Sequence, residues 1–209
     1  NSVLKNYKVD KLENKNIKYS FNNIEQEKNS ISETFILSSG SNFFKNEINC
    51  NLTGNYSSAF VNGIFYLNND KHHEIRTIIN HLTENTKSYQ LIKGVLDDGS
   101  KAVYQGKIFV KSEAQKTDGY QLSKAILLNK DSEFNAKPEL EIYADDVKCS
   151  HGSTSGNLNE DSIFYLMSRG LNYQQSKELL INGFLLDVVD KITDVEIKNL
   201  IKNLIGVKE

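Results

Sequence analysis

The sequence predicts a mainly β protein that ends in a small α-helical domain, and three observations lead to this prediction. Between about residues 34 and 151, short runs of β-branched and aromatic residues are separated by Gly, Asn and Asp at intervals of roughly 8 to 12 residues. No stretch of that region holds a helical period. After Asn157 the apolar residues follow the period of an amphipathic helix. We therefore predict a β domain over residues 1–156 and a helical domain over residues 157–209.

The predicted strands of the β domain are short, and their order in space is left open. They cover residues 34–37, 47–52, 63–67, 75–79, 107–110, 125–128 and 139–143. Alternation is clearest at Ile48, Cys50 and Leu52, which indicates that Cys50 is a core residue. Residues 1–30 have a weaker pattern, interpreted as irregular or edge strands. A sandwich, a jelly roll and a parallel β-solenoid all fit, because no repeat of fixed length is found.

Three helices are predicted after Asn157. Asn159 caps a helix that runs through Ser168, and Asn172 forms a capping box for the second helix. The third helix begins at a capping box over residues 193–196, with Thr193 as the cap. The apolar stripes predicted for the second and third helices are Leu179, Leu180, Phe184 and Val188, and Ile197, Leu200, Ile201, Leu204 and Ile205. So small a bundle leaves apolar surface for the β domain or for a partner.

Composition excludes several classes of function. A net charge of -2 and a pI near 6.1 argue against binding to nucleic acid or to an anionic membrane. Two cysteines far apart in sequence suit a reducing compartment, and no apolar stretch approaches the roughly 20 residues of a membrane span. We therefore predict a cytoplasmic protein.

Cys149 and His151 are the most informative residues, because side chains two apart on a strand share a face. A thiolate and an imidazole are ligands for iron, zinc or copper, but protein sites for these metals need three or four ligands. The other cysteine in the sequence is Cys50. If the pair binds metal, the missing ligands come from another molecule, so the pair indicates an interface. The alternative is a packed thiol beside a hydrogen-bonded histidine.

A change of phase predicts a bend just before this pair. Apolar residues occupy even positions up to Ala144 and odd positions from Val147 onwards. The change falls at the aspartate pair 145–146, which suits a bulge or a tight corner. Cys149 and His151 are therefore predicted to lie on a short strand of their own, on the same side as Val147.

Other candidate sites are weaker. His72, His73 and His81 resemble a metal set, but adjacent residues on a strand point to opposite faces, so we do not expect a three-histidine site. Residues 94–99 lack the Gly-Lys-Ser/Thr ending of a phosphate-binding loop, so we do not expect this chain to bind ATP through such a loop. Asp98-Gly99 is interpreted as a turn between strands.

A rival hypothesis is a β-helical enzyme that cleaves polysaccharides. Its catalytic carboxylates would come from Glu139, Glu141, Asp145 and Asp146. Such clefts usually carry aromatic platforms, and the sequence has no Trp. A charge ladder on the outer face of a strand is the preferred interpretation of Glu139 and Glu141. A third hypothesis is a purely structural solenoid whose Cys149 and His151 have no chemical role.

Two segments near the C-terminus resemble a known family. Residues 138–152, Pro-Glu-Leu-Glu-Ile-Tyr-Ala-Asp-Asp-Val-Lys-Cys-Ser-His-Gly, and residues 159–170 are similar to the C-terminal signature of the SufB/SufD family of iron–sulfur cluster assembly scaffolds, in its SufD form. Matching motifs upstream lie at residues 93–100, 106–110 and 114–117 and at Gln121. The sequence departs from the family pattern at Ser153, at Ser155 and over residues 157–159, which are mild changes in a turn and a helix cap.

The resemblance implies a right-handed parallel β-helix followed by a helical domain, and it implies that the sequence is roughly the C-terminal half of a SufD protein. It implies a non-catalytic scaffold that pairs with a SufB-like subunit and docks a SufC-like ATPase through its helices. Cys149 and His151 would contribute to a nascent iron–sulfur cluster shared with SufB, and no cluster would be stably bound by this chain alone. A solenoid that begins here exposes strand edges, so we also expect either a homodimer in isolation or residues 1–30 covering that end.

Overall fold

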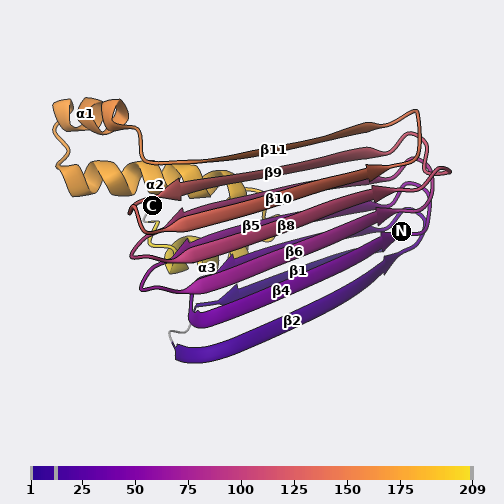
Figure 1. The fold of residues 1–209 in the computed structure, drawn as a ribbon, viewed down its shortest axis with the longest axis horizontal. Helices are drawn as coiled ribbons and strands as arrows, with labels where there is room; N and C mark the ends of the chain where they lie inside the picture. Colours follow the sequence, from indigo (N-terminus) through magenta and orange to yellow (C-terminus); the bar gives the residue numbers. More distant parts are fainter. Residues whose placement is uncertain (1, 12–13, 208–209) are drawn as a thin grey trace.

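The chain winds into two parallel β-sheets that face each other, as the computed structural model of residues 2–11 and 14–207 shows (Figure 1). Successive strands alternate between the sheets, and every pair of neighbouring strands is parallel. Sheet A has the order β1-β3-β5-β7-β9-β11 and sheet B the order β10-β8-β6-β4-β2. The fold is therefore a parallel β-solenoid of about five turns, which selects one of the three architectures that the sequence left open.

The strands of the two sheets have these bounds. Sheet A contains β1 (Val3–Asp10), β3 (Ile31–Ser38), β5 (Ser58–Leu67), β7 (Lys87–Leu96), β9 (Asp118–Leu127) and β11 (Lys148–Gly156). Sheet B contains β2 (Asn14–Gln26), β4 (Ser41–Leu52), β6 (His72–His81), β8 (Lys101–Val110) and β10 (Glu133–Ile142). Residues 1–30 thus supply β1 and β2, the edge strands of the first turn.

The interior of the solenoid is filled by alternate residues of both sheets. Ile48, Cys50 and Leu52 of β4 are buried, which confirms the alternation expected there. The interior also holds hydrogen-bonded polar side chains, such as Gln90 and Tyr104. The Tyr104 hydroxyl donates to Gln90 Oε1 at 3.1 Å, and both residues are buried.

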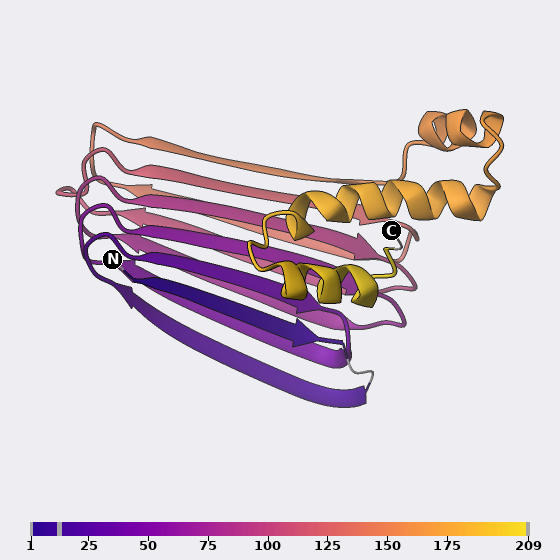
Figure 2. The same cartoon turned by 180° about the vertical axis from the view of Figure 1, so that it is seen from behind.

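Helices α1 (Glu160–Ser168), α2 (Tyr173–Val189) and α3 (Val195–Leu204) follow the solenoid. α2 and α3 cover the outer face of sheet A, and α1 projects beyond the ends of the strands (Figure 2). Asn159 and Asn172 cap α1 and α2 as expected, and Asn172 forms the capping box with Gln175. The apolar side chains of α2 and α3 share a core with residues of sheet A, among them Phe35, Leu37, Ile64, Leu91 and Val95.

A lysine fastens α2 to the sheet. The Lys93 side chain on β7 is only 7% exposed, and its Nζ lies 2.8 Å from both Asp187 Oδ2 and the Phe184 carbonyl oxygen. The ammonium also lies 4.4 Å from the centre of the Phe184 ring. This bond set holds α2 in one position along the strands.

Two expectations about the helices need correction. Of the stripe predicted for α2, Val188 is buried and Phe184 packs against the core, but Leu179 is 52% exposed, and the buried face also includes Ile181, Leu185 and Val189. The cap of α3 is Asp194, whose carboxylate accepts from the Ile197 amide at 3.1 Å. Thr193 donates its hydroxyl to Glu33 of β3 instead.

Among the described residues, no helix is long and apolar enough to cross a membrane. The expected turn at Asp98-Gly99 is present between β7 and β8, with φ of 48° at Asp98 and 70° at Gly99.

Candidate functional site on the last turn

The last turn of the solenoid is open on its outer side. β10 is an edge strand of sheet B and β11 is an edge strand of sheet A, so each pairs with only one neighbour. The corner that joins them falls at residues 143–147, with Asp145 and Asp146 in a bend, as the change of phase predicted. Asp146 accepts at its carbonyl from the Lys116 amide at 2.6 Å, which ties the corner to the turn below. The corner thus directs the chain from sheet B back to sheet A as β11.

Cys149 points into the solenoid from β11. Its side chain is half-buried and packs with Val147 against Ile108, Val110, Ala114 and Ala144. Its register partner is Gly119, where an added Cβ would lie 3.3 Å from the Cys149 Sγ atom, so the glycine leaves room for the thiol. Burial raises the pKa of the Cys149 thiol, and a hydrogen bond with the Gly119 backbone opposes that shift in part. The thiol is therefore neutral at pH 7 in the chain by itself.

His151 lies two residues further along the same face of β11 and is exposed. Its register partner on β9 is Gln121, which is buried inside the solenoid. Within residues 2–11 and 14–207, no side chain or backbone group hydrogen-bonds to the imidazole. Both ring nitrogens are therefore open to a molecule that covers the last turn.

Cys149 and His151 are two side chains that could each bind a metal, fewer than a protein metal site needs. No group of three or more His, Cys, Asp or Glu side chains placed to hold a metal ion occurs among the described residues. A metal held at this end would take its remaining ligands from outside the described part of the chain.

The three histidines at positions 72, 73 and 81 do not form a site. His72 lies on the outer face of sheet B beside Glu74, whereas His73 and His81 point inward, as the alternation predicted. The His73 Nε2 atom lies 2.7 Å from the Ser41 carbonyl, and the His81 nitrogens lie 2.7 Å and 2.9 Å from the hydroxyls of Thr86 and Ser88. Both buried imidazoles are thus held by hydrogen bonds within the fold.

Cys50 is a core residue, as predicted. It is 1% exposed, and its Sγ atom lies 3.0 Å from Gln26 Oε1. Burial raises the pKa of its thiol to about 12. The Cys50 thiol is therefore expected to be far less reactive than the Cys149 thiol.

The carboxylates of β10 form an ion-pair ladder. Lys107 on β8 pairs with Glu139 at 2.9 Å and also with Glu141. All three side chains lie on the outer face of sheet B, in agreement with a surface charge ladder. Because both carboxylates are ion-paired with the same lysine on an open strand surface, this arrangement gives no support to a polysaccharide-cleaving site.

Two features of the site were not predicted from the sequence. One is the open edge at β10 and β11, since neither strand has a second neighbour among the described residues. The other is Gly119, whose role becomes visible only when it is paired with Cys149 about 30 residues later. A glycine in a strand interior is the signal that would have drawn attention to a close approach at this position.

These observations define the class of the protein: a parallel β-solenoid that presents a thiol and an imidazole on an end strand with one neighbour. Residues 1–184 match the family described as SUF system FeS cluster assembly, SufBD core domain. The chain belongs to this family.

Curated relatives agree with the family assignment. The iron–sulfur cluster assembly protein SufD of Escherichia coli K12 is 35% identical over 175 residues, which are 84% of this chain and 41% of the relative. A SufBD family protein of Synechocystis is 45% identical over 103 residues, 49% of this chain and 23% of the relative. A SufBD family protein of Mycobacterium leprae is 27% identical over 158 residues, 72% of this chain and 40% of the relative. The chain therefore spans less than half the length of these relatives.

Proposed function

We propose that the chain is the core of a SufD-like scaffold subunit, on which an iron–sulfur cluster is assembled together with a SufB-like subunit. The observation that carries the proposal is the position of Cys149 and His151 on β11, an edge strand with an incomplete set of ligands. The name of the Escherichia coli relative, an iron–sulfur cluster assembly protein, supports it. The cluster is the cargo of the scaffold.

The open end suits a protein partner. The edges of β10 and β11 present unpaired backbone N–H and C=O groups, which pair readily with strands of another chain. A partner that adds strands here would place its own ligands next to Cys149 and His151. The two halves of the cluster site are then completed by the same event that joins the subunits.

The protonation of Cys149 fits a site that is active only in the complex. A thiol must lose its proton to bind iron, and burial makes this loss unfavourable in the chain alone. The positive charge of incoming iron stabilises the thiolate and releases the proton. His151 in its neutral form offers one ring nitrogen as a ligand.

The docking site that we propose for a SufC-like ATPase is α1. It buries Ile163 alone, while Phe164, Tyr165 and Met167 are 74%, 55% and 44% exposed. Deletion of all residues after Leu171 would not test this cleanly, because α2 and α3 share a core with sheet A. Phe164→Ser should abolish co-purification with the ATPase, whereas Leu200→Ser on α3 should not. Retained binding in Phe164→Ser would place the ATPase elsewhere.

The decisive experiment is co-expression with SufB-like and SufC-like subunits, followed by anaerobic purification and measurement of iron, sulfide and visible absorption. Cys149→Ser and His151→Ala should each lower cluster content about tenfold or more, the scale of effect when a metal-site group is lost. Cys50→Ser and His72→Ala are matched controls and should retain the cluster. Full cluster content in both site variants would contradict the proposal and favour a purely structural solenoid.

Oxidation of the same complex tests the geometry. A disulfide requires Cα atoms within about 7 Å, so a crosslink to the partner should form through Cys149. Cys149→Ser should remove the crosslinked heterodimer and Cys50→Ser should not. A crosslink that depends on Cys50 would show that the interface has been assigned to the wrong cysteine.

A further inference from the structure

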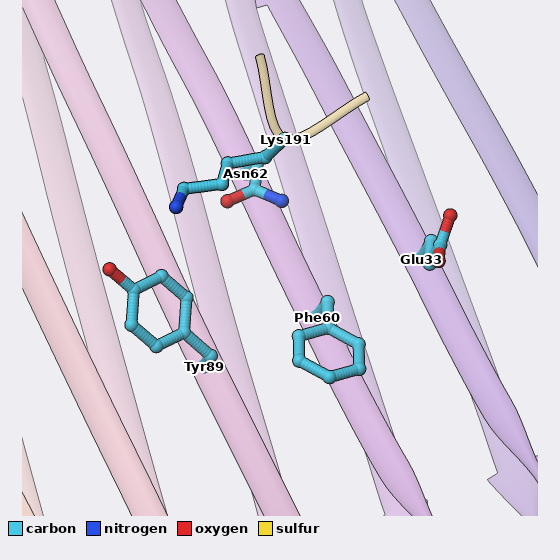
Figure 3. A pocket seen from close by; sticks show the side chains of 5 residues that line it. All are labelled: Glu33, Phe60, Asn62, Tyr89 and Lys191. Carbon is cyan, nitrogen blue, oxygen red and sulfur yellow. The ribbon is translucent and has the colours of Figure 1, made fainter. Parts of the chain in front are cut away.

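A cavity of about 370 Å³ lies on the outer face of sheet A, on the side of the molecule covered by the helices. It is lined by Glu33 of β3, Phe60 and Asn62 of β5, Tyr89 of β7, and Lys191, which follows α2 (Figure 3). It lies where the apolar cover of α2 ends, so its floor is sheet and one wall is the connection to α3. The cavity is separate from Cys149 and His151, which point into the solenoid from β11.

Asn62 is a polar residue in an apolar row. Its register partners, Phe35 on β3 and Leu91 on β7, are 2% and 1% exposed and belong to the core beneath the helices. Asn62 is 8% exposed, and its Oδ1 atom has no hydrogen-bond partner among the described residues. An unpaired buried amide oxygen is unfavourable, and a leucine would fit the row better. The oxygen lies on the buried side of the amide, so a half-turn about χ2 is what presents it to a donor that enters the cavity from outside the chain.

The floor of the cavity beside Asn62 is aromatic. Phe60 and Tyr89 are register partners on neighbouring strands. The Tyr89 ring stacks on Tyr120, with centroids 5.2 Å apart and planes inclined by 26°. This stacking fixes the orientation of the Tyr89 ring. Phe60 and Tyr89 therefore form a preformed surface on which another ring can stack.

The rim of the cavity carries one charge of each sign. Glu33 accepts from the Thr193 hydroxyl at 2.8 Å, and the Lys191 ammonium lies 6.0 Å from the centre of the Tyr89 ring. Figure 3 shows the two charged groups on opposite sides of Asn62 and Phe60. A lining with one cation and one anion does not suit a nucleotide or another polyanion. Such a lining suits an uncharged aromatic ring that is flanked in its own molecule by charged groups.

We propose that this cavity binds the indole side chain of a tryptophan on a partner protein, with the ring on Phe60 and Tyr89 and its N–H donating to Asn62 Oδ1. Indole is the side chain that joins an aromatic body to a single N–H donor and has no acceptor to satisfy. Tryptophan is also among the residues that most often anchor protein interfaces in pockets of this kind. Glu33 and Lys191 favour a basic and an acidic residue on either side of the anchor.

The test uses the absence of tryptophan from this chain, which leaves indole fluorescence free of background. N-acetyl-tryptophanamide is the probe, and its anisotropy and emission wavelength are followed as protein is added. Anisotropy should rise and emission should move to the blue. Asn62→Leu should weaken binding about tenfold, the scale of one hydrogen bond. Asn135→Leu, a change of an exposed asparagine on sheet B, should leave binding unchanged.

Two further arms keep the result unambiguous. The 1-methylindole analogue of the probe lacks the N–H donor and should bind the protein and its Asn62→Leu variant equally. Urea unfolding of Asn62→Leu should show a raised midpoint, because the variant loses an unpaired amide, and this checks that it folds. No rise in anisotropy, or an equal loss of affinity for both probes in Asn62→Leu, would overturn the proposal. Tighter binding of free tryptophan than of the capped probe would indicate an amino-acid site and would also overturn it.

Discussion

One cysteine and one histidine in the middle turns, and another of each on the last turn, point into the solenoid, but their surroundings differ. In the middle turns, Cys50 and His81 are buried, and His81 has a hydrogen-bond partner at each ring nitrogen. On the last turn, Cys149 is half-buried and His151 is exposed. The middle strands have a neighbour on both sides, whereas β11 has one. In a solenoid, position along the axis therefore decides whether an inward thiol or imidazole is structural or available for chemistry.

The two thiols should differ most in alkylation by iodoacetamide at pH 8. With a pKa of about 12, the Cys50 thiol is ionised in about one molecule in ten thousand at this pH, and its burial blocks access. We expect Cys149 to react at least about 1,000-fold faster than Cys50 in the folded chain, with peptide mass spectrometry as the measurement. In urea the two rates should converge. Equal alkylation rates of Cys50 and Cys149 in the folded chain would show that the two thiols do not differ in reactivity between the turns.

Glycine substitutions should separate the same two regions by stability. A Cβ added at Gly54, between β4 and β5, would lie 2.0 Å from the Lys28 backbone nitrogen, whereas one at Gly156 on β11 would have no atom within 4 Å. Gly54→Ala should lower the free energy of unfolding by about 3 kcal/mol or more, because backbone must move. Gly156→Ala should change it by less than about 0.5 kcal/mol. Urea titrations that give similar losses would contradict the described packing.

Acid should act on the middle turns through His81. Burial lowers the pKa of His81 to about 4, below the ordinary value of 6.5 that it regains on unfolding. Stability from this group is complete above pH 6.5 and is lost as the pH falls towards 4, since the unfolded chain then binds the extra proton. At pH 5 the loss relative to pH 7.5 should be about 2 kcal/mol. His81→Asn should lose that part of the pH dependence, and an unchanged profile would refute the assignment.

Only a small effect on stability is expected at His151. Because the imidazole is exposed and has no partner among the described residues, His151→Ala should change the free energy of unfolding by less than about 1 kcal/mol. His72→Ala, at a side chain 41% exposed on sheet B, is the matched control. A loss of 2 kcal/mol or more in His151→Ala would mean that the residue is structural and would weaken its proposed role in cluster assembly.

Features of the fold that depend on local chemistry were predictable. The caps at Asn159 and Asn172 and the corner at Asp145 and Asp146 are set by residues within a few positions of each other. The solenoid was not evident from periodicity, because register partners such as Ile31, Ser58, Lys87 and Asp118 are spaced unevenly along the chain. Connections of unequal length hide the repeat. The fold was expected from the resemblance alone.

The errors in the helices also have physical causes. α2 carries apolar residues around most of its circumference, so several stripes fit its sequence, and contact with sheet A selects Ile181 and Leu185. The Thr193 hydroxyl is drawn to Glu33, a residue 160 positions away, and Asp194 takes over the cap. The environment of Cys149 depends in the same way on Gly119 of the preceding turn. Such long-range contacts leave no local trace.

The single neighbour of β11 has a consequence for motion. Each strand in a parallel stack is held by the strands above and below it, so opening should be cheapest at the ends and costliest near β5 to β8. Amide hydrogen exchange should then be graded along the axis, with the strand that carries Cys149 among the fastest. A partner that pairs with this strand would suppress its local opening and hold the thiol and imidazole at fixed positions. Under the proposed function, docking would thereby act as a checkpoint, because Cys149 and His151 would become rigid only once a partner strand is paired.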